Sequence, residues 1–134
     1  MTCRLALALA LLLAAAGCRR DLGPAERYQA FATAARSGDA NAVWSMLSER
    51  SREALDARAR DVASRAPPGV VAGSGRQLVL GDLAARTPRP KAVVLRRESR
   101  ERAVVAVEVE GEPAREVTLV REGGVWRVDL PFDN

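Results

Sequence analysis

The first hydrophobic segment of the chain is a run of leucine and alanine over residues 5–16, preceded by a positive charge at Arg4 and followed by Gly17 and Cys18. A charged start, a short apolar stretch and small residues at the cut are typical of a secretory signal peptide. The stretch is shorter than the roughly 20 residues that span a bilayer. We therefore expect residues 1–17 to be removed, which makes Cys18 the first mature residue.

After a short polar stretch, apolar residues recur with a helical period. Positions i, i+3, i+4 and i+7 of this pattern are Tyr28, Phe31, Ala32 and Ala35. They predict one buried face of an amphipathic helix that begins near Pro24, a residue suited to the first turn. Gly38 is expected to end this helix, and Asp39 to cap the next one.

Two further helical stretches follow. The apolar residues of the first, a short one, are Val43, Trp44, Met46 and Leu47. The other covers residues 51–65 and is expected to bury Leu55, Ala59 and Val62 on one face. Its opposite charges four residues apart, which should add a few tenths of a kcal/mol each, are Arg52–Asp56, Asp56–Arg60 and Asp61–Arg65.

The pattern weakens over residues 70–90, where glycine and proline suggest loop around a short apolar piece at residues 78–83. That piece fits a strand or a helical turn, and the sequence does not decide between them. The Gly73-Ser74-Gly75 stretch is interpreted as loop, because it neither follows a clear strand nor opens a clear helix, as a phosphate-binding loop would.

The last third of the chain changes to a period of two. Four valine-rich segments of strand length cover residues 92–98, 103–110, 114–121 and 125–130. The connections between them are short, so they predict an antiparallel meander. The expected inward side chains are Val105, Val107, Val109, Val117, Leu119, Trp126, Val128 and Leu130. Those expected on the opposite, wetter face are Glu108, Glu110, Arg115, Arg121, Arg127 and Asp129.

Helices followed by antiparallel strands predict an α+β domain over residues 24–134, with the N-terminal helices packed against a curved sheet of four or slightly more strands. The opening from Tyr28 through Gly38-Asp39 to Leu47, and the closing hairpin at residues 119–128, resemble the nuclear-transport-factor-2-like superfamily of cystatin-like domains. Within it the chain is most similar to small bacterial lipoproteins and lumazine-binding-like proteins. The resemblance implies a cavity between helix and sheet.

The segment that closes on Ala15-Ala16-Gly17-Cys18 also resembles the lipobox of bacterial lipoproteins, with Ala15 where that family usually has leucine. The resemblance implies diacylglycerol on the Cys18 thiol, a further acyl chain such as palmitate on its amino group, and residues 18–23 as a short tether. Arg19, where retained lipoproteins carry aspartate, implies the periplasmic face of the outer membrane of a Gram-negative cell. Secretion without lipid and an uncleaved anchor remain as alternatives.

The amino-acid composition limits the kinds of catalytic and binding site that the chain can form. The 134 residues include no histidine and two cysteines, and the formal charge is +4. Cys3 would leave with the signal peptide and Cys18 would carry lipid, so no histidine- or cysteine-dependent catalysis and no zinc site is expected. Basic residues alternate with acidic ones and aromatic residues are few, which argues against nucleic acid as a partner. No cofactor is expected.

The candidate site residues are few. Those that could line a helix–sheet cavity are Tyr28, Phe31, Trp44 and Trp126, with core packing as the simpler role for each. The acidic group Glu108, Glu110 and Glu116 could hold a cation, but arginines on the same face favour charge pairing instead. The sequence thus favours a non-catalytic binding or assembly module with an unidentified periplasmic partner. The alternatives are a carrier of a small apolar ligand and an enzyme of the isomerase or dehydratase kind.

Overall fold

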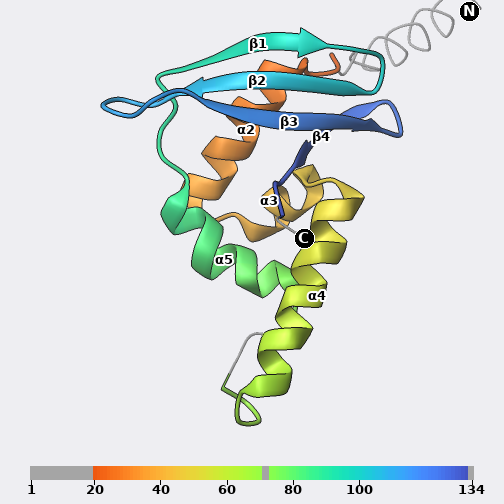
Figure 1. Cartoon of the computed structure of the whole chain (residues 1–134), viewed down its shortest axis with the longest axis vertical. Coiled ribbons are helices and arrows are strands. Elements are labelled where there is room, and N and C mark those ends of the chain that lie inside the picture. The colour runs from red at the N-terminus through yellow and green to blue at the C-terminus, as the bar shows by residue number, and fades with distance from the viewer. Residues whose placement is uncertain (1–19, 71–72, 133–134) are drawn as a thin grey trace, which may run out of the picture.

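The computed structural model describes residues 20–70 and 73–132, so the expected signal peptide and Cys18 lie outside the described residues. Helices come first and strands follow (Figure 1): α2 (Pro24–Ser37), α3 (Ala40–Met46), α4 (Glu49–Arg65), α5 (Gly75–Arg86), β1 (Ala92–Glu98), β2 (Arg102–Glu108), β3 (Arg115–Glu122) and β4 (Val125–Asp129). The strands form one open antiparallel sheet, and the helices lie on one side of it (Figure 1). The prediction of an α+β domain is therefore confirmed.

The sheet is a meander in the order β1-β2-β3-β4. All four strands agree with the predicted segments to within two residues. One irregularity interrupts the pairing of β1 with β2, between Leu95 and Arg97. At the other edge, Leu47 forms an isolated parallel bridge with Val128, so the junction of α3 and α4 runs beside β4.

The predicted caps set the ends of the first two helices. Glu26 accepts a hydrogen bond from the backbone N–H of Gly23 at 3.1 Å, which fastens the start of α2. Gly38 ends that helix with φ of 74°, a left-handed conformation that glycine adopts without steric cost. Asp39 then caps α3 by accepting from the Ala42 N–H at 3.0 Å. Both cap predictions are confirmed.

The undecided stretch is part of a helix, α5 (Gly75–Arg86), and packing explains its first residue, Gly75. Ser74 is the N-cap, because its side chain accepts from the Gln77 N–H. A Cβ on Gly75 would stand 2.7 Å from the backbone nitrogen of Asp56, so only glycine permits this approach of α5 to α4. The Gly75 N–H donates to the Asp56 carboxylate at 2.8 Å. The interpretation of Gly73-Ser74-Gly75 as plain loop is corrected to a helix start.

Two expectations for the third helix were wrong. Val62 is 36% exposed, because the second half of α4 extends beyond the sheet with little packed against it (Figure 1). Among its three expected charge pairs, the described structure forms Asp61–Arg65, with Arg65 Nη2 and Asp61 Oδ1 2.8 Å apart. Asp56 instead binds the start of α5, which replaces both of its expected partners.

The core lies between α2 and the inner face of the sheet. Its buried members are Tyr28, Phe31, Ala32, Ala35, Val43, Leu47, Leu55, Val79, Ala103, Val105, Val107, Leu119, Trp126 and Val128. All of them fall between residues 28 and 128, and the first helix begins at Pro24. The buried core that the structure describes therefore lies within a fragment of residues 20–134.

Of the side chains expected on the wet face of the sheet, two lie on the inner face and a third is buried. Residues two apart in a strand share a face, so Arg115 and Arg121 lie on the face of Val117 and Leu119. The Arg121 guanidinium stands 4.6 Å from the ring centroid of Trp126, which it covers. Asp129 is only 8% exposed, because the start of α4 covers this edge of the sheet.

Burial of Trp126 predicts a large effect of its removal on stability. The side chain is 3% exposed, and its contacts join β4 to the core. Trp126→Ala in the fragment of residues 20–134 should lower the free energy of unfolding by about 3–5 kcal/mol. Urea denaturation measures it, with Val70→Ala as the control, because Val70 is 69% exposed. Equal denaturation midpoints for the two variants would contradict the burial of Trp126.

Candidate ligand pocket

A pocket of about 350 Å³ opens between α2, the sheet and the segment that joins α5 to β1. Its apolar walls are built by Tyr28, Phe31, Pro88, Val107, Val117, Val128, Leu130 and Pro131. Charged side chains also line it: Arg50, Arg86, Arg115, Glu116 and Asp129. Its volume falls at the lower end of the range of small-molecule sites, roughly 300–1,000 Å³.

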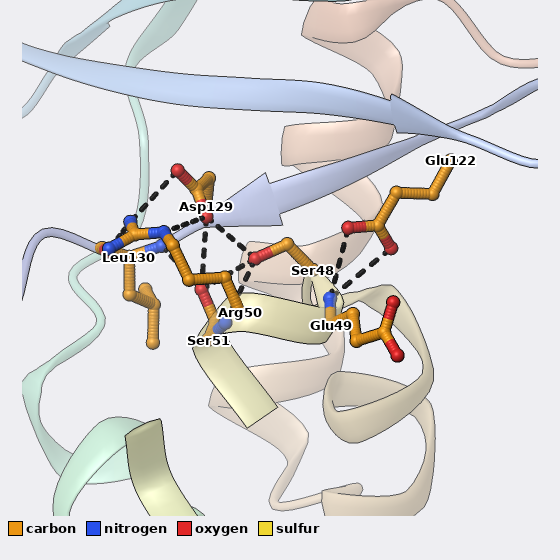
Figure 2. Close-up of polar contacts among 7 residues, drawn as sticks. All are labelled: Ser48, Glu49, Arg50, Ser51, Glu122, Asp129 and Leu130. Carbon is orange, nitrogen blue, oxygen red and sulfur yellow. Dashed lines mark hydrogen bonds and ion pairs between the residues drawn. The ribbon is translucent and has the colours of Figure 1, made fainter. Parts of the chain in front are cut away.

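The polar side of the pocket is held by Asp129, at the end of β4 (Figure 2). Its Oδ1 accepts a hydrogen bond from the Ser48 hydroxyl at 2.6 Å and from the Arg50 Nε at 3.1 Å. Its Oδ2 accepts from Arg50 Nη2 at 2.9 Å, so the guanidinium binds both carboxylate oxygens. Arg50 also donates to the Leu130 carbonyl at 2.7 Å. Asp129 is therefore satisfied although it is nearly buried.

The same contacts begin helix α4. Ser48 is its N-cap and accepts from the Ser51 N–H at 3.1 Å, while the Ser51 hydroxyl accepts from the Leu130 N–H at 2.8 Å. A second carboxylate, Glu122, accepts from the Glu49 N–H at 3.0 Å (Figure 2). Negative charge near the N-terminus of a helix is stabilised by the helix dipole. Both carboxylates thus fasten the closing hairpin to α4.

The balance of these contacts sets the charge of Asp129. Burial raises the pKa of its carboxyl, but the hydrogen bonds and charge of Arg50 and the serine hydroxyls outweigh burial, so the pKa lies below its usual value. Asp129 is therefore ionised at neutral pH and compensates the charge of Arg50. Glu116 is likewise paired, with its Oε2 3.2 Å from Arg97 Nη2.

Tyr28 and Arg115 are two polar residues of the pocket whose side chains are not satisfied by another side chain of the described residues. Within the described residues, neither the Tyr28 hydroxyl nor the Arg115 guanidinium has a protein hydrogen-bond partner or an acidic partner. Burial raises the pKa of the Tyr28 phenol, and the nearby positive charge of Arg115 only partly offsets this. The phenol is therefore protonated at neutral pH and can donate a hydrogen bond beside a guanidinium.

The structure separates the four aromatic residues expected around a cavity. Tyr28 and Phe31 line the pocket, with ring centroids 5.8 Å apart. Trp44 and Trp126 do not line it. Trp44 is half-buried, with the Arg76 guanidinium 5.8 Å from its ring, and Trp126 lies toward the start of α2 under Arg121.

Sequence reasoning missed Arg50, Arg115 and Asp129 as site residues. The signal for Arg115 was present, since its position two residues before Val117 places it on the inner face. Arg50 and Asp129 are 79 residues apart, and only the fold brings them together. Arg115 is also a charged neighbour of Tyr28, and its positive charge acts on the pKa of the phenol.

Other kinds of site find little support in the part of the chain that the structure describes. There, no group of three or more acidic, histidine or cysteine residues is arranged to hold a metal ion. Glu110 and Glu116 of the acidic group are paired with Lys91 and Arg97. None of the described helices is both long and apolar enough to cross a membrane. Comparison with family models, curated proteins and solved structures yields no match.

The lowered pKa of Asp129 predicts a pH dependence of stability. A carboxyl with a depressed pKa in the folded state stabilises the fold above its unfolded pKa, about 3.9, and loses this effect as the pH falls through the folded value. Asp129→Asn should therefore lower the free energy of unfolding at pH 7 by about 1.5–3 kcal/mol, and flatten the loss of stability below pH 4. Urea denaturation across pH measures both effects.

The matched control is Asp61→Asn, which removes an exposed carboxylate from the Arg65 pair on α4. Exposed pairs contribute about 0–1 kcal/mol, so this variant should keep nearly the original stability and acid dependence. If both aspartate variants behave alike, the Asp129 contacts do not fasten the hairpin in solution.

Proposed function

We propose that this chain is a lipid-anchored periplasmic lipoprotein whose nuclear-transport-factor-2-like domain binds a small ligand between α2 and the sheet. The anchor rests on the apolar run over residues 5–16 that ends at Cys18. The order of elements, and the packing of the first helix on an antiparallel meander, support the family assignment. Arg19 supports the periplasmic face of the outer membrane as the site of anchoring.

The observation that carries the binding function is the Tyr28 hydroxyl. It belongs to a residue only 7% exposed, lines the pocket and has no protein partner within the described residues. The hydroxyl oxygen is not among the buried side-chain atoms that lack a partner, so solvent reaches it from the pocket and a ligand oxygen can take the place of that solvent. An open pocket with such a donor favours a ligand carrier over an assembly module that uses only its outer surface.

The lining also indicates the class of ligand. The walls are mostly apolar, so the ligand's body is apolar. Arg50 and Glu116 are compensated by Asp129 and Arg97, which leaves the Arg115 charge and the Tyr28 donor for the ligand. Both groups suit an acidic oxygen. The ligand is therefore a small apolar molecule with one acidic group, rather than a fully apolar one.

The proposed module is non-catalytic. Tyr28 is the titratable group at the apolar wall, and its raised pKa keeps the phenol protonated, which suits a hydrogen-bond donor and not a base at neutral pH. Asp129 is held by Arg50 and two serines, so its lone pairs are engaged. A ligand incubated with the protein should be recovered chemically unchanged.

The anchor has its own test. Mass spectrometry of the protein purified from membranes should show an N-terminus at Cys18 that carries the mass of two or three acyl chains. Cys18→Ala should accumulate as an unprocessed precursor. A mature protein that begins at or after residue 18 without acyl mass would refute the anchor. This result would not bear on ligand binding in the pocket, which is tested separately.

The pocket is tested with two fluorescent probes of the same shape, the anionic 8-anilinonaphthalene-1-sulfonate and the neutral N-phenyl-1-naphthylamine. The fragment of residues 20–134 should bind the anionic probe more tightly. Arg115→Ala should weaken that binding by about tenfold or more, since a hydrogen bond to a charged group contributes about 1.5–3 kcal/mol. Tyr28→Phe should have a smaller effect in the same direction.

Arg121→Ala is the matched control, because it removes an arginine of the same strand and face that lies outside this pocket. It should leave the affinity for the anionic probe unchanged. Neutral-probe binding should be the same in all three variants. A response of both probes to Arg115→Ala, or an equal response to Arg121→Ala, would show that the pocket does not select an acidic group.

A further inference from the structure

A second hollow lies at the opposite side of α2. It is an open groove of about 540 Å³ between the C-terminal half of that helix and the start of β1. Its lining residues from α2 are Gln29, Thr33, Arg36 and Ser37, and those before and in β1 are Arg89 to Val93. Neither family resemblance nor the proposed ligand pocket assigns a role to this groove, which shares no lining residue with that pocket.

The groove carries charge of a single sign. Arg36, Arg89 and Lys91 line it, and no acidic residue does. Elsewhere on the described surface, some arginines, such as Arg65 and Arg97, have carboxylates within 4 Å, and others, such as Arg96, do not. Arg36 and Arg89 have no such partner within the described residues, so their positive charge is available to an incoming anion.

Lys91 does not cancel this charge. Its Nζ lies 3.3 Å from Glu110 Oε2, but both side chains are largely exposed, at 66% and 84%. An exposed pair of this kind contributes at most about 1 kcal/mol, so the lysine can exchange its partner for a ligand at little cost. The C-terminus of α2 adds a partial negative charge of roughly one half, which three cations exceed.

The uncharged lining residues point to hydroxyl groups on the ligand. The hydroxyls of Thr33 and Ser37 donate to backbone carbonyls of their own helix, at 2.9 Å in both cases, so their free lone pairs can accept. The Gln29 side-chain amide has no partner within the described residues and can both donate and accept. These groups suit a polyol better than an apolar body.

The size and position of the groove restrict the class of ligand further. The groove is far larger than a single phosphate ion needs, and polar and apolar atoms contribute about equally to its walls, which suits a ligand with polar groups better than a lipid tail. Arg36 stands 12 residues after Pro24, which is roughly 18 Å along the helix from the end where the chain enters the domain. If the chain is anchored at that end, as proposed above, the groove is displaced from the headgroups and faces soluble molecules.

We propose that the groove between α2 and β1 binds a soluble, hydroxyl-rich oxyanion, of which a sugar phosphate is the simplest representative. The guanidinium groups of Arg36 and Arg89 bind the phosphate, because their planar donors match two of its oxygens. Gln29, Thr33 and Ser37 bind the hydroxyls. Lys91 adds charge at the rim.

Isothermal titration at low salt tests this assignment with glucose 6-phosphate, glucose and inorganic phosphate as probes. The fragment of residues 20–134 should bind glucose 6-phosphate more tightly than either of the other two. Arg36→Ala combined with Arg89→Ala should weaken that binding about tenfold or more. Gln29→Ala should weaken the binding of glucose 6-phosphate and leave that of inorganic phosphate unchanged.

The control is Arg96→Ala combined with Arg100→Ala, which removes two exposed arginines outside the groove and changes the net charge equally. The affinity for glucose 6-phosphate should be unchanged in this control and in Arg115→Ala. Arg115 lines the ligand pocket and not the groove, so the second variant distinguishes the two sites. Circular dichroism should show that all variants are folded. The proposal would be overturned by equal losses of affinity in the groove and control variants. Equal affinity for phosphate and glucose 6-phosphate, or no binding of glucose 6-phosphate, would also overturn it.

Vesicles separate a soluble ligand from a lipid headgroup, which offers the same phosphate chemistry. Phosphatidylcholine vesicles with and without phosphatidylglycerol are sedimented with the fragment. Binding to the anionic vesicles should not depend on Arg36 and Arg89. If the double variant loses vesicle binding, the groove recognises the membrane surface instead, and the assignment to a soluble ligand is wrong.

Discussion

The attachment of the last strand to the start of α4 is the contact on which the arrangement of this domain depends. Asp129 closes β4, and its carboxylate binds Ser48, Arg50 and Ser51, about 80 residues earlier in the chain. A nearly buried charge is costly unless it is fully hydrogen-bonded, and here two hydroxyls and a bidentate guanidinium supply the bonds. Because Ser48 also caps α4, one network both begins the helix and positions the sheet edge.

This attachment also sets the charge of the ligand pocket, and so distinguishes it from the groove on the other side of α2. Asp129 takes up the charge of Arg50, so the ligand pocket is left with an apolar wall, one uncompensated arginine and the phenol of Tyr28. The groove has no carboxylate in its lining, and its charge stays uncompensated. The segment between α5 and β1 borders both, with Thr87 and Pro88 in the pocket and Arg89 and Pro90 in the groove. Two prolines restrict its backbone, which keeps the two walls apart.

Much of the fold is determined by local sequence. Pro24 and Gly38 set helix ends through backbone geometry, and Asp39 does so by accepting a hydrogen bond from a nearby backbone N–H. These effects are local and do not need the rest of the molecule. Alternation and short turns in the last third determine the meander, because strands joined so closely can only pair with their neighbours. The inner face follows from the same alternation, including Arg115 and Arg121, which it places beside Val117 and Leu119.

Tertiary structure decided the rest. The local sequence of α5 favours a helix only weakly, because it contains Gly75 and Gly81. The helix is stabilised by its contact with α4, where Gly75 allows a close approach to Asp56. Alternation alone puts Asp129 on the outer face, but only the position of α4 at the end of β4 buries its side chain there. The ligand pocket likewise consists of side chains from helices, strands and a linker far apart in the chain. Local patterns encode elements because their hydrogen bonds are local, whereas a pocket depends on the distances between elements, which packing alone sets.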